Sequence, residues 1–356
     1  MGCTSPMKRW VNHDETWSKI TGYHEKYVKD NRGIPIYKFQ EIPCGKCIAC
    51  RLEYSKQWAN RCMLEAREHE ENQFITLTYA DEYLPKTKGI NIETGEIDYE
   101  YATLKPEDLQ KFMKDLRRYY EYHYDWKYKE HEVLPFDNWD RHENGHFYKV
   151  DNWGIRFYAC GEYGTEKERP HYHIIAFNLP IFDKNYLFTD NKTGTKNYTS
   201  ETIEKIWKKG IVGVADVTWE SCAYVARYVM KKAKGRNAVE LFRESGREQE
   251  FTRMSRNPGI AKHYYEQHKD KIYENDEIWL KNKKGAIKAK PARYFDKLYD
   301  LEHPELMEAI KKNRQTIAEQ VEKTRKENSD LSREEYLEQQ EIIMENRAKR
   351  LKRGLK

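Results

Sequence analysis

The stretch RPHYHIIAF, residues 169–177, begins with two histidines and continues as an apolar run of strand-forming residues. Side chains two residues apart on a strand point to the same face of a sheet. His171 and His173 therefore predict two imidazoles side by side on a rigid element, which is half of a divalent-metal site. A strand with two surface histidines and no metal gives the same pattern, so the interpretation depends on the other motifs.

Composition restricts the classes of protein to which the chain can belong. Its 356 residues can bury a sizeable core, in two domains or in one domain with appendages. The mean hydropathy is −1.04 and the apolar runs fall far short of the roughly 20 residues that span a bilayer, so we expect no membrane segment. The net charge of +5, with 27 Tyr and 9 Trp, suits contacts to phosphates and unpaired bases, although a tyrosine-rich fold gives the same counts.

The N-terminal sequence MGCTSP shows no apolar core of a signal peptide. Pro6 stands where a myristoylation signal has Ser or Thr. We therefore expect an intracellular protein whose thiols stay reduced.

Five of the seven cysteines precede residue 65, and three of them form the double CxxC motif CGKCIAC. This spacing wraps thiolates around a tetrahedral ion, and zinc requires four ligands. We predict a structural Zn²⁺ site formed by Cys3, Cys44, Cys47 and Cys50. Cys62 is an alternative fourth ligand, and an iron–sulfur cluster or reduced thiols without metal stay open.

Strand and helix patterns alternate along the chain. FITLTY at 74–79 alternates bulky apolar residues with threonine, as in a strand with one face in a core. Further strands are predicted over 155–160 and 211–217, with a hairpin turn at Thr94-Gly95. Helices are predicted over 51–70 and at three later points, beginning at Pro106, after Ser200 and after Thr218. This mixture, with strands in antiparallel reach, predicts an α+β fold with helices packed on an antiparallel sheet.

The remaining segments have less regular patterns. Residues 123–153 are interpreted as an insertion. Within residues 250–300, SRNPGI at 255–260 and PARYF at 291–295 are interpreted as basic, aromatic loops that either line a strand-binding groove or are ordinary surface turns. From Leu301 the chain is expected to form one long polar helix with a basic end, which either contacts DNA or is solvated.

The helix predicted after Thr218 carries a second chemical signal. In AYVARYVMKK, Tyr224 and Tyr228 are four residues apart and share a helix face, with Lys231 one turn beyond. A phenol has a pKa near 10, so it needs help to attack a phosphate, which a metal and a nearby ammonium supply. An amphipathic helix with two packed tyrosines is the simpler alternative.

Together the motifs resemble those of the HUH endonucleases that initiate rolling-circle replication, and most closely the replication initiators of gokushovirus-type Microviridae. The resemblance covers about residues 1–300 and rests on Cys3 with PCGKCIACR, and on FITLTY, GEYG, RPHYHIIAF, YVARYVMKK and SRNPGI. Tyr172 departs from the aliphatic residue usual between the two histidines.

The resemblance implies a role for particular residues. The metal ligands that it implies are His171, His173 and Glu162, and the catalytic residues are Tyr224, Tyr228 and Lys231. Glu166 and Glu168 are less favoured third ligands. The ion would be Mg²⁺ or Mn²⁺, which suit mixed nitrogen and oxygen ligands.

The resemblance also implies an HUH fold of the ferredoxin or RRM type, with a central antiparallel sheet of about five strands flanked by helices. On this basis we expect four parts: a Cys-rich segment with a zinc knuckle and helix (1–70), the endonuclease domain (71–240), a basic and aromatic accessory region (241–300) and a charged helical tail (301–356).

The implied function is that of a metal-dependent nickase and strand transferase. It would cut single-stranded origin DNA of a small phage in the host bacterial cytoplasm through a 5′-phosphotyrosine, and later rejoin it. Because the chain has no GxxxxGK[ST] loop, we expect it to depend on host helicase and polymerase. The alternatives are a non-catalytic zinc-containing nucleic-acid-binding protein and an HUH transposase or relaxase.

Overall fold

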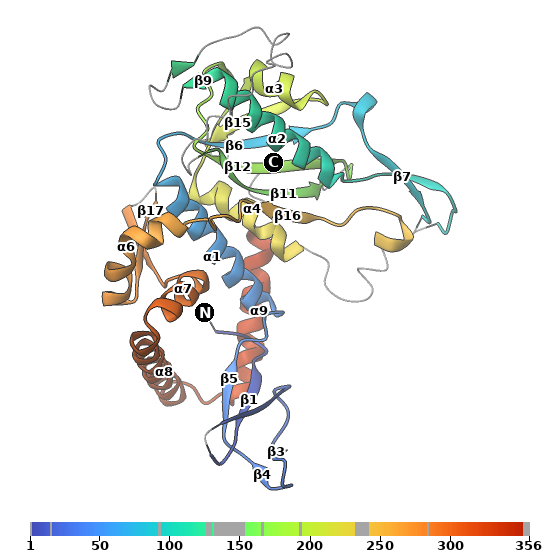
Figure 1. Cartoon of the computed structure of the whole chain (residues 1–356). Helices are drawn as coiled ribbons and strands as arrows, with labels where there is room; N and C mark the ends of the chain where they lie inside the picture. The colour runs from blue at the N-terminus through green and yellow to red at the C-terminus, as the bar shows by residue number, and fades with distance from the viewer. Residues whose placement is uncertain are drawn as a thin grey trace. The chain divides into compact units, whose positions relative to one another are not determined.

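A computed structural model describes the chain except for residues 1, 15, 92–93, 126–129, 132–153, 165–166, 192–193, 232–241, 283–284 and 352–356. The chain forms two compact units, and the smaller combines Met1–Gln57 with Pro291–Lys356 while the larger is Trp58–Lys290 (Figure 1). The boundary between the units falls within helix α1 (Ile48–Ala66).

The larger unit is built on a seven-stranded sheet in the order β13-β14-β15-β6-β12-β11-β16. Every neighbouring pair in this sheet is antiparallel. The strands are β6 (Asn72–Thr78), β11 (Arg156–Tyr163), β12 (Pro170–Phe177), β13 (Lys184–Thr189), β14 (Lys196–Ser200), β15 (Val212–Asp216) and β16 (Phe251–Met254). The described chain therefore has the predicted α+β character.

Helices cover both faces of this sheet (Figure 1). On one face, α2 (Pro106–His123) and α3 (Glu201–Trp207) share a core with Ile75 and Leu77 of β6. On the other face, α4 (Trp219–Lys231) packs against β11 and β12. The alternation of FITLTY decides this division, because Ile75 and Leu77 are fully buried while Thr76 between them faces the α4 side and contacts His173.

Short local signals begin the helices where the sequence predicts them. Pro106 is the first residue of α2, where its missing N–H costs nothing. The Ser200 hydroxyl accepts a hydrogen bond from the Ile203 N–H at 3.2 Å. Thr218 does the same for the Ser221 N–H at 3.1 Å and precedes α4. The predicted turn at Thr94-Gly95 joins β7 (Lys86–Gly89) to β8 (Tyr99–Ala102).

The expectation of about five strands is too low. Of the two loops predicted within the range 250–300, SRNPGI is confirmed as a turn, whereas PARYF is helical from Arg293 onward. Residues 184–200 form the extra hairpin β13–β14, and β16 pairs with β11 at the opposite edge. The range also contains α6 (Lys262–Asn275), the hairpin of β17 (Ile278–Asn282) and β18 (Gly285–Ala289), and the start of α7 (Arg293–Glu302). These elements lack a clear period in the sequence; β16 is formed by pairing with the distant strand β11, and β17 and β18 pair with each other.

The predicted insertion at 123–153 lies mostly outside the described residues. At its start, β9 (Tyr124–Asp125) pairs with β10 (Glu130–His131). Nothing in the described residues tests the character of the rest.

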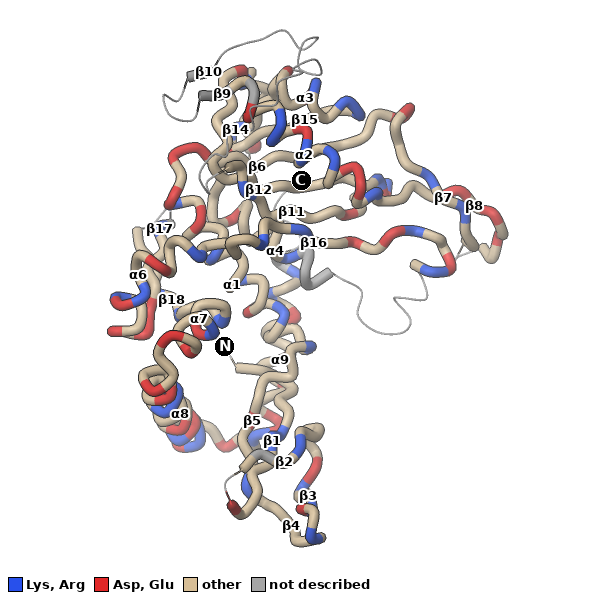
Figure 2. The backbone as a smooth tube through the Cα atoms, viewed as in Figure 1, with Lys and Arg blue, Asp and Glu red and all other residues tan. Residues whose placement is uncertain are grey.

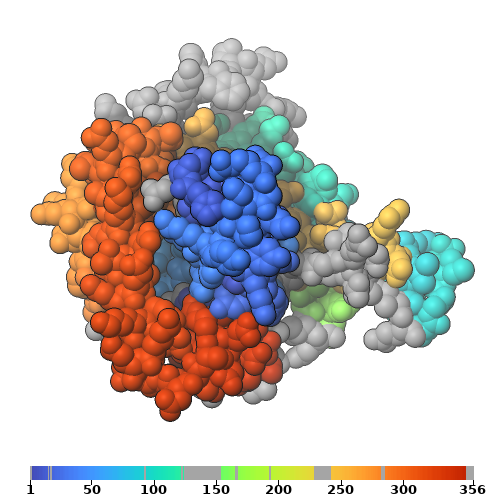
Figure 3. All heavy atoms as spheres, turned by 90° about the horizontal axis from the view of Figure 1, so that it is seen from below, coloured from blue at the N-terminus to red at the C-terminus, as the bar shows by residue number. Residues whose placement is uncertain are grey.

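The smaller unit contains a three-stranded sheet in the order β2-β1-β5 and a two-stranded ladder of β3 with β4. Trp10, Val28 and Ile36 form a buried hydrophobic cluster among these strands. Its strands are β1 (Met7–Val11), β2 (Trp17–Thr21), β3 (Val28–Lys29), β4 (Pro35–Ile36) and β5 (Phe39–Ile42). Figure 3 shows these N-terminal residues in blue beside the C-terminal helices in orange and red, and Arg333 pairs with Glu41 at 2.8 Å.

The C-terminal tail is two helices rather than the single one expected. These are α8 (Pro304–Glu327) and α9 (Arg333–Leu351). A capping box separates them, because Ser332 and Glu335 exchange hydrogen bonds between side chain and backbone at 2.8 and 3.3 Å. The sequence SREE carries this signal, which the period of apolar residues along the helix does not reveal. Along α8, basic and acidic residues are interleaved, as on a solvated helix (Figure 2).

Candidate active site

Adjacent strands place three candidate metal ligands on the α4 face of the sheet. In the antiparallel register of β11 and β12, Glu162 lies opposite His171. The Nε2 atoms of His171 and His173 lie 2.6 and 3.0 Å from the same oxygen, Oε1 of Glu162. The two histidines therefore converge as the i, i+2 spacing predicts, and the hairpin supplies a carboxylate between them.

The other nitrogen of each imidazole is held by a separate partner. Nδ1 of His171 donates to the Arg169 carbonyl at 3.1 Å, since a carbonyl can only accept. Nδ1 of His173 lies 3.0 Å from the Thr76 hydroxyl, and Phe74 stacks on the His173 ring at 5.5 Å. These contacts direct both Nε2 atoms toward Glu162, which is the orienting role that outer partners have in metal sites.

Glu162 is a buried carboxylate, with only 2% of its surface exposed. Burial opposes its ionisation, but the contacts with His171 and His173 outweigh the burial and lower the pKa of Glu162 to about 2. The group is therefore a carboxylate at neutral pH, which is the form that binds cations.

The three ligand atoms fit a divalent cation. They all lie within 4.8 Å of one another. Ligands at right angles around an ion with bonds near 2.1 Å are roughly 3.0 Å apart, close to the 2.6 and 3.0 Å that separate Oε1 from the two nitrogens. Glu162, His171 and His173 could thus hold such an ion on one side and leave the other side open.

Tyr224 of α4 reaches the same carboxylate. Its hydroxyl donates to Oε1 of Glu162 at 3.0 Å, and its ring meets that of His173 edge-on at 5.0 Å. Burial and the nearby Glu162 charge raise the pKa of Tyr224 above its ordinary value. The phenol is therefore held protonated beside the candidate metal site, and it must lose its proton to act as a nucleophile.

Other predicted site residues are not placed there by the structure. Tyr228 and Lys231 belong to α4, but their side chains lie outside the described residues. The same is true of Glu166. Glu168 instead pairs with Arg247 at 2.6 Å, and its side chain is 65% exposed, so the structure does not bring it to the site.

Tyr172, which stands between the two histidines, points to the opposite face of the sheet. Its hydroxyl lies 2.8 Å from the hydroxyl of Tyr79 and donates to the Lys105 carbonyl at 2.8 Å. Tyr79 in turn donates to Asp108 at 2.8 Å. A phenol is acceptable at this usually aliphatic position because its hydroxyl has partners within the core.

In the smaller unit, the four predicted cysteines gather at one point. Cys3 Sγ lies 3.5 Å from Cys44 Sγ and 3.6 Å from Cys47 Sγ, close to the roughly 3.8 Å of thiolates around tetrahedral zinc. The four sulfur atoms, including that of Cys50, lie within 4.8 Å of one another. Burial opposes ionisation of Cys47, but contacts with Thr4 and Cys50 outweigh it and lower the pKa of Cys47 to about 6. The group could hold a metal, and Cys62 is buried elsewhere, in the larger unit.

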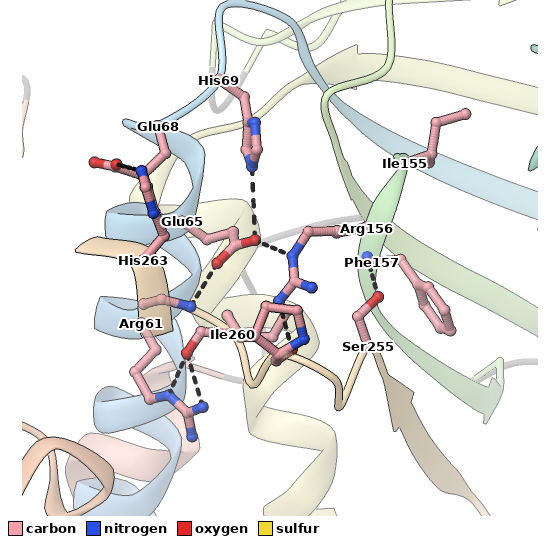
Figure 4. A network of polar contacts seen from close by, with 12 residues as sticks. Arg61, Glu65, Glu68, His69, Ile155, Arg156, Phe157, Ser255, Ile260 and His263 are labelled. Carbon is pink, nitrogen blue, oxygen red and sulfur yellow. Dashed lines mark hydrogen bonds and ion pairs between the residues drawn. The ribbon is translucent and has the colours of Figure 1, made fainter. Parts of the chain in front are cut away.

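The SRNPGI segment is anchored inward by a buried polar network (Figure 4). Glu65 of α1 accepts hydrogen bonds from Arg156 of β11 and from the Ala261 N–H. Arg61 donates to the Ile260 carbonyl at 2.8 Å, and Arg156 donates to the Pro258 carbonyl at 2.8 Å. The segment thus joins α1 to β11, a role that the prediction of a groove or surface turn did not include.

Comparison with known proteins gives concordant matches. Residues 72–233 match a family model described as replication-associated protein ORF2/G2P, and this range contains every predicted metal and tyrosine residue of the larger unit. The replication-associated protein ORF2 of Spiroplasma virus 4 is 33% identical over 88% of this chain and 86% of its own length. The replication-associated protein VP4 of Bdellovibrio phage phiMH2K is 28% identical over 74% and 69% of the two chains. No solved structure matches. Within the described part of the chain, no helix is both long and apolar enough to cross a membrane.

Proposed function

Because the chain belongs to the family of microvirus replication-associated proteins, we propose that it nicks and rejoins origin DNA during rolling-circle replication of a small single-stranded DNA phage. The observation that carries this proposal is that one carboxylate oxygen contacts both the nucleophile and the histidines. The Tyr224 hydroxyl lies 3.0 Å from Oε1 of Glu162, and the same oxygen contacts His171 and His173. In this proposal the nucleophile and the cation site meet at one carboxylate, as metal-assisted phosphoryl transfer requires.

The ion would be held by Glu162, His171 and His173. When bound, Mg²⁺ or Mn²⁺ would polarise a non-bridging oxygen of the scissile phosphate. In this proposal the seven-stranded sheet with its helices is an HUH endonuclease fold.

The chain's own residues carry the bond changes. The Tyr224 phenolic oxygen attacks phosphorus as its proton passes to solvent, and a tyrosyl phosphoester bond forms. The bond from phosphorus to the 3′ oxygen breaks, and that oxygen takes up a proton to become a free 3′-hydroxyl primer. Tyr228 would serve as the second nucleophile and Lys231 would stabilise the developing charge. The reverse attack by a 3′-hydroxyl reseals a strand.

Other parts of the chain have supporting roles in the proposal. The cysteine group would hold a structural Zn²⁺ within residues 1–70, and residues 241–300 and 301–356 would be accessory segments around an endonuclease domain over 71–240. Host helicase and polymerase would supply unwinding and synthesis in the bacterial cytoplasm.

The tyrosine assignment is tested by trapping the covalent product. We expect the full chain with Mn²⁺ and oligonucleotides tiling the phage genome to form a 5′-linked protein–DNA adduct on denaturing gels. Tyr224→Phe combined with Tyr228→Phe should abolish it, since a ring without a hydroxyl cannot attack. Tyr186→Phe is a matched control, because this exposed tyrosine of β13 lies far along the sheet order from the site.

Each result has a defined meaning. An adduct that persists in the double variant contradicts the tyrosine assignment, and full nicking by a His171→Ala, His173→Ala chain in Mn²⁺ contradicts the metal site. Tight DNA binding by the wild-type chain with no adduct at any genome segment favours a non-catalytic nucleic-acid-binding protein instead.

A further inference from the structure

Arg227 is a half-buried cation on the helix that carries Tyr224. It follows Tyr224 by three residues, so the two side chains are about 60° apart around the helix axis. The guanidinium carbon lies 5.8 Å from the centre of the Tyr224 ring. Arg227 makes no hydrogen bond or ion pair with any residue that the structure describes.

Other arginines with half-buried or buried side chains in the same unit have oxygen acceptors. Arg156 pairs with Glu65, Arg61 binds the Ile260 carbonyl, and Arg247 pairs with Glu168. Arg117 donates to the Ile155 carbonyl at 2.9 Å. A guanidinium withdrawn from water is costly unless it has an acceptor, and among the described residues Arg227 is the exception, so we look for an anion that binds there during function.

The carboxylate that Tyr224 contacts, that of Glu162, already has several partners. Oε1 of Glu162 accepts contacts from His171, His173 and Tyr224, and ion binding would occupy it further. Burial also lowers the pKa of Arg227 relative to an ordinary arginine, which agrees with a partly dehydrated position next to the Tyr224 phenol.

The anion that the reaction brings to this position is the scissile phosphodiester, because its phosphorus must come within bonding distance of the Tyr224 oxygen. A guanidinium matches the geometry of phosphate oxygens and can donate two parallel hydrogen bonds. We propose that Arg227 is a further catalytic residue, which binds a non-bridging oxygen of the scissile phosphate and keeps hold of that phosphate in the tyrosyl adduct. This inference rests on the proposed nicking function.

The test measures single-turnover adduct formation on the oligonucleotide that the wild-type chain cleaves. The oligonucleotide carries either an ordinary scissile phosphate or one of its two phosphorothioate diastereomers. The variants are Arg227→Gln and Arg227→Lys. Arg253→Gln is the matched control, since Arg253 is an exposed arginine of β16 in the same unit and its loss removes the same charge.

We expect Arg227→Gln to slow adduct formation about 10²-fold, as for the loss of one donor to a developing oxyanion. Arg253→Gln should stay within about threefold of wild type, because exposed charges contribute little. Mn²⁺ binding should be unchanged in Arg227→Gln, because Arg227 is not a ligand. The ratio of rates for the two phosphorothioate diastereomers should also change. Without the guanidinium, replacing the oxygen that Arg227 binds by sulfur no longer removes a hydrogen bond.

Three results would overturn the role of Arg227. One is a wild-type rate in Arg227→Gln, and another is a slower rate with an unchanged diastereomer ratio, which marks a purely structural effect. The third applies if Arg227→Gln does not fold: Arg227→Lys then decides, and a wild-type rate and ratio in that variant exclude a specific guanidinium contact. Absence of an adduct in the wild-type chain would instead refute the nicking function.

Discussion

Single residues on β12 serve both faces of the sheet. His171 and His173 point toward Glu162 and α4, while Tyr172 between them enters the core beneath α2. The Tyr172 hydroxyl shares a buried network with Tyr79 and the backbone of Lys105. Burial raises the pKa of Tyr172 to about 12 even though the hydrogen bonds with Tyr79 and the Lys105 backbone lower it, so the group stays neutral. The hydroxyl of Tyr172 therefore fixes the strand that presents the two imidazoles to the core on the opposite face of the sheet.

Removing this hydroxyl should affect stability more than the metal site. We expect Tyr172→Phe to lower the free energy of unfolding by about 1–3 kcal/mol, because it leaves buried polar partners unsatisfied. Urea unfolding measures this change, with Tyr186→Phe as an exposed control. Mn²⁺ affinity should stay within a few-fold of wild type. An unchanged free energy of unfolding in Tyr172→Phe would show that the hydrogen bonds of this hydroxyl make no net contribution to stability.

At the scale of elements, helix α1 and strand β11 are joined through the segment after β16. Glu65 is nearly inaccessible and lies at the centre of the contacts with Arg156, His69 and the Ala261 N–H. Burial opposes its ionisation, but these partners outweigh it and lower the pKa of Glu65 below its ordinary value. Since β11 also carries Glu162, the same strand links this network to the candidate active site.

The Glu65 network should make stability depend on pH. A carboxylate whose folded pKa is depressed stabilises the protein above its unfolded pKa of about 4.3, and this contribution is lost as pH falls through the lower folded value. We expect Glu65→Gln to cost about 3–5 kcal/mol near neutral pH, since it leaves Arg156 buried without its partner. Urea unfolding of both chains from pH 7 to pH 3 should show the difference shrinking below pH 4. A constant difference across this range would contradict the assignment.

At the scale of the whole molecule, each compact unit contains its own candidate metal group. The cysteine group belongs to the smaller unit, and the Glu162 group belongs to the larger. The N-terminal strands of the smaller unit enclose a hydrophobic cluster of only Trp10, Val28 and Ile36, so this part has little burial with which to offset chain entropy. A metal that ties Cys3 to the CGKCIAC segment would supply that missing stability.

Loss of the cysteine ligands should therefore affect the units unequally. We expect Cys44→Ser to reduce bound zinc by one equivalent per chain and to speed hydrogen exchange in β1 and β5, with little change in β6 and β12. Metal analysis and hydrogen exchange by mass spectrometry on the full chain measure both effects. Cys222→Ser is the matched control, because that buried cysteine lies in the larger unit. Equal zinc content in wild type and Cys44→Ser would exclude the site.

Several features follow from neighbouring residues alone. The alternation of FITLTY, the i, i+2 histidines, and the helix starts at Pro106, Ser200 and Thr218 are local signals, and the structure confirms these strands and helices. The order and spacing of the motifs also identified the family, which the comparisons confirm. Local backbone preference and side-chain period need no knowledge of distant segments.

Other features depended on contacts between residues far apart in the chain. The hairpin β13–β14 and the edge strand β16 gain their partners only when the sheet assembles, and the Glu65 network joins residues up to 196 positions apart. Only the register of β11 against β12 showed that Glu162 lies between the histidines, and only packing of α4 brought Tyr224 to it. The sequence by itself determined which chemical groups were available. The tertiary structure decided which of them meet, because burial and hydrogen bonding between distant segments are set only when the chain is folded.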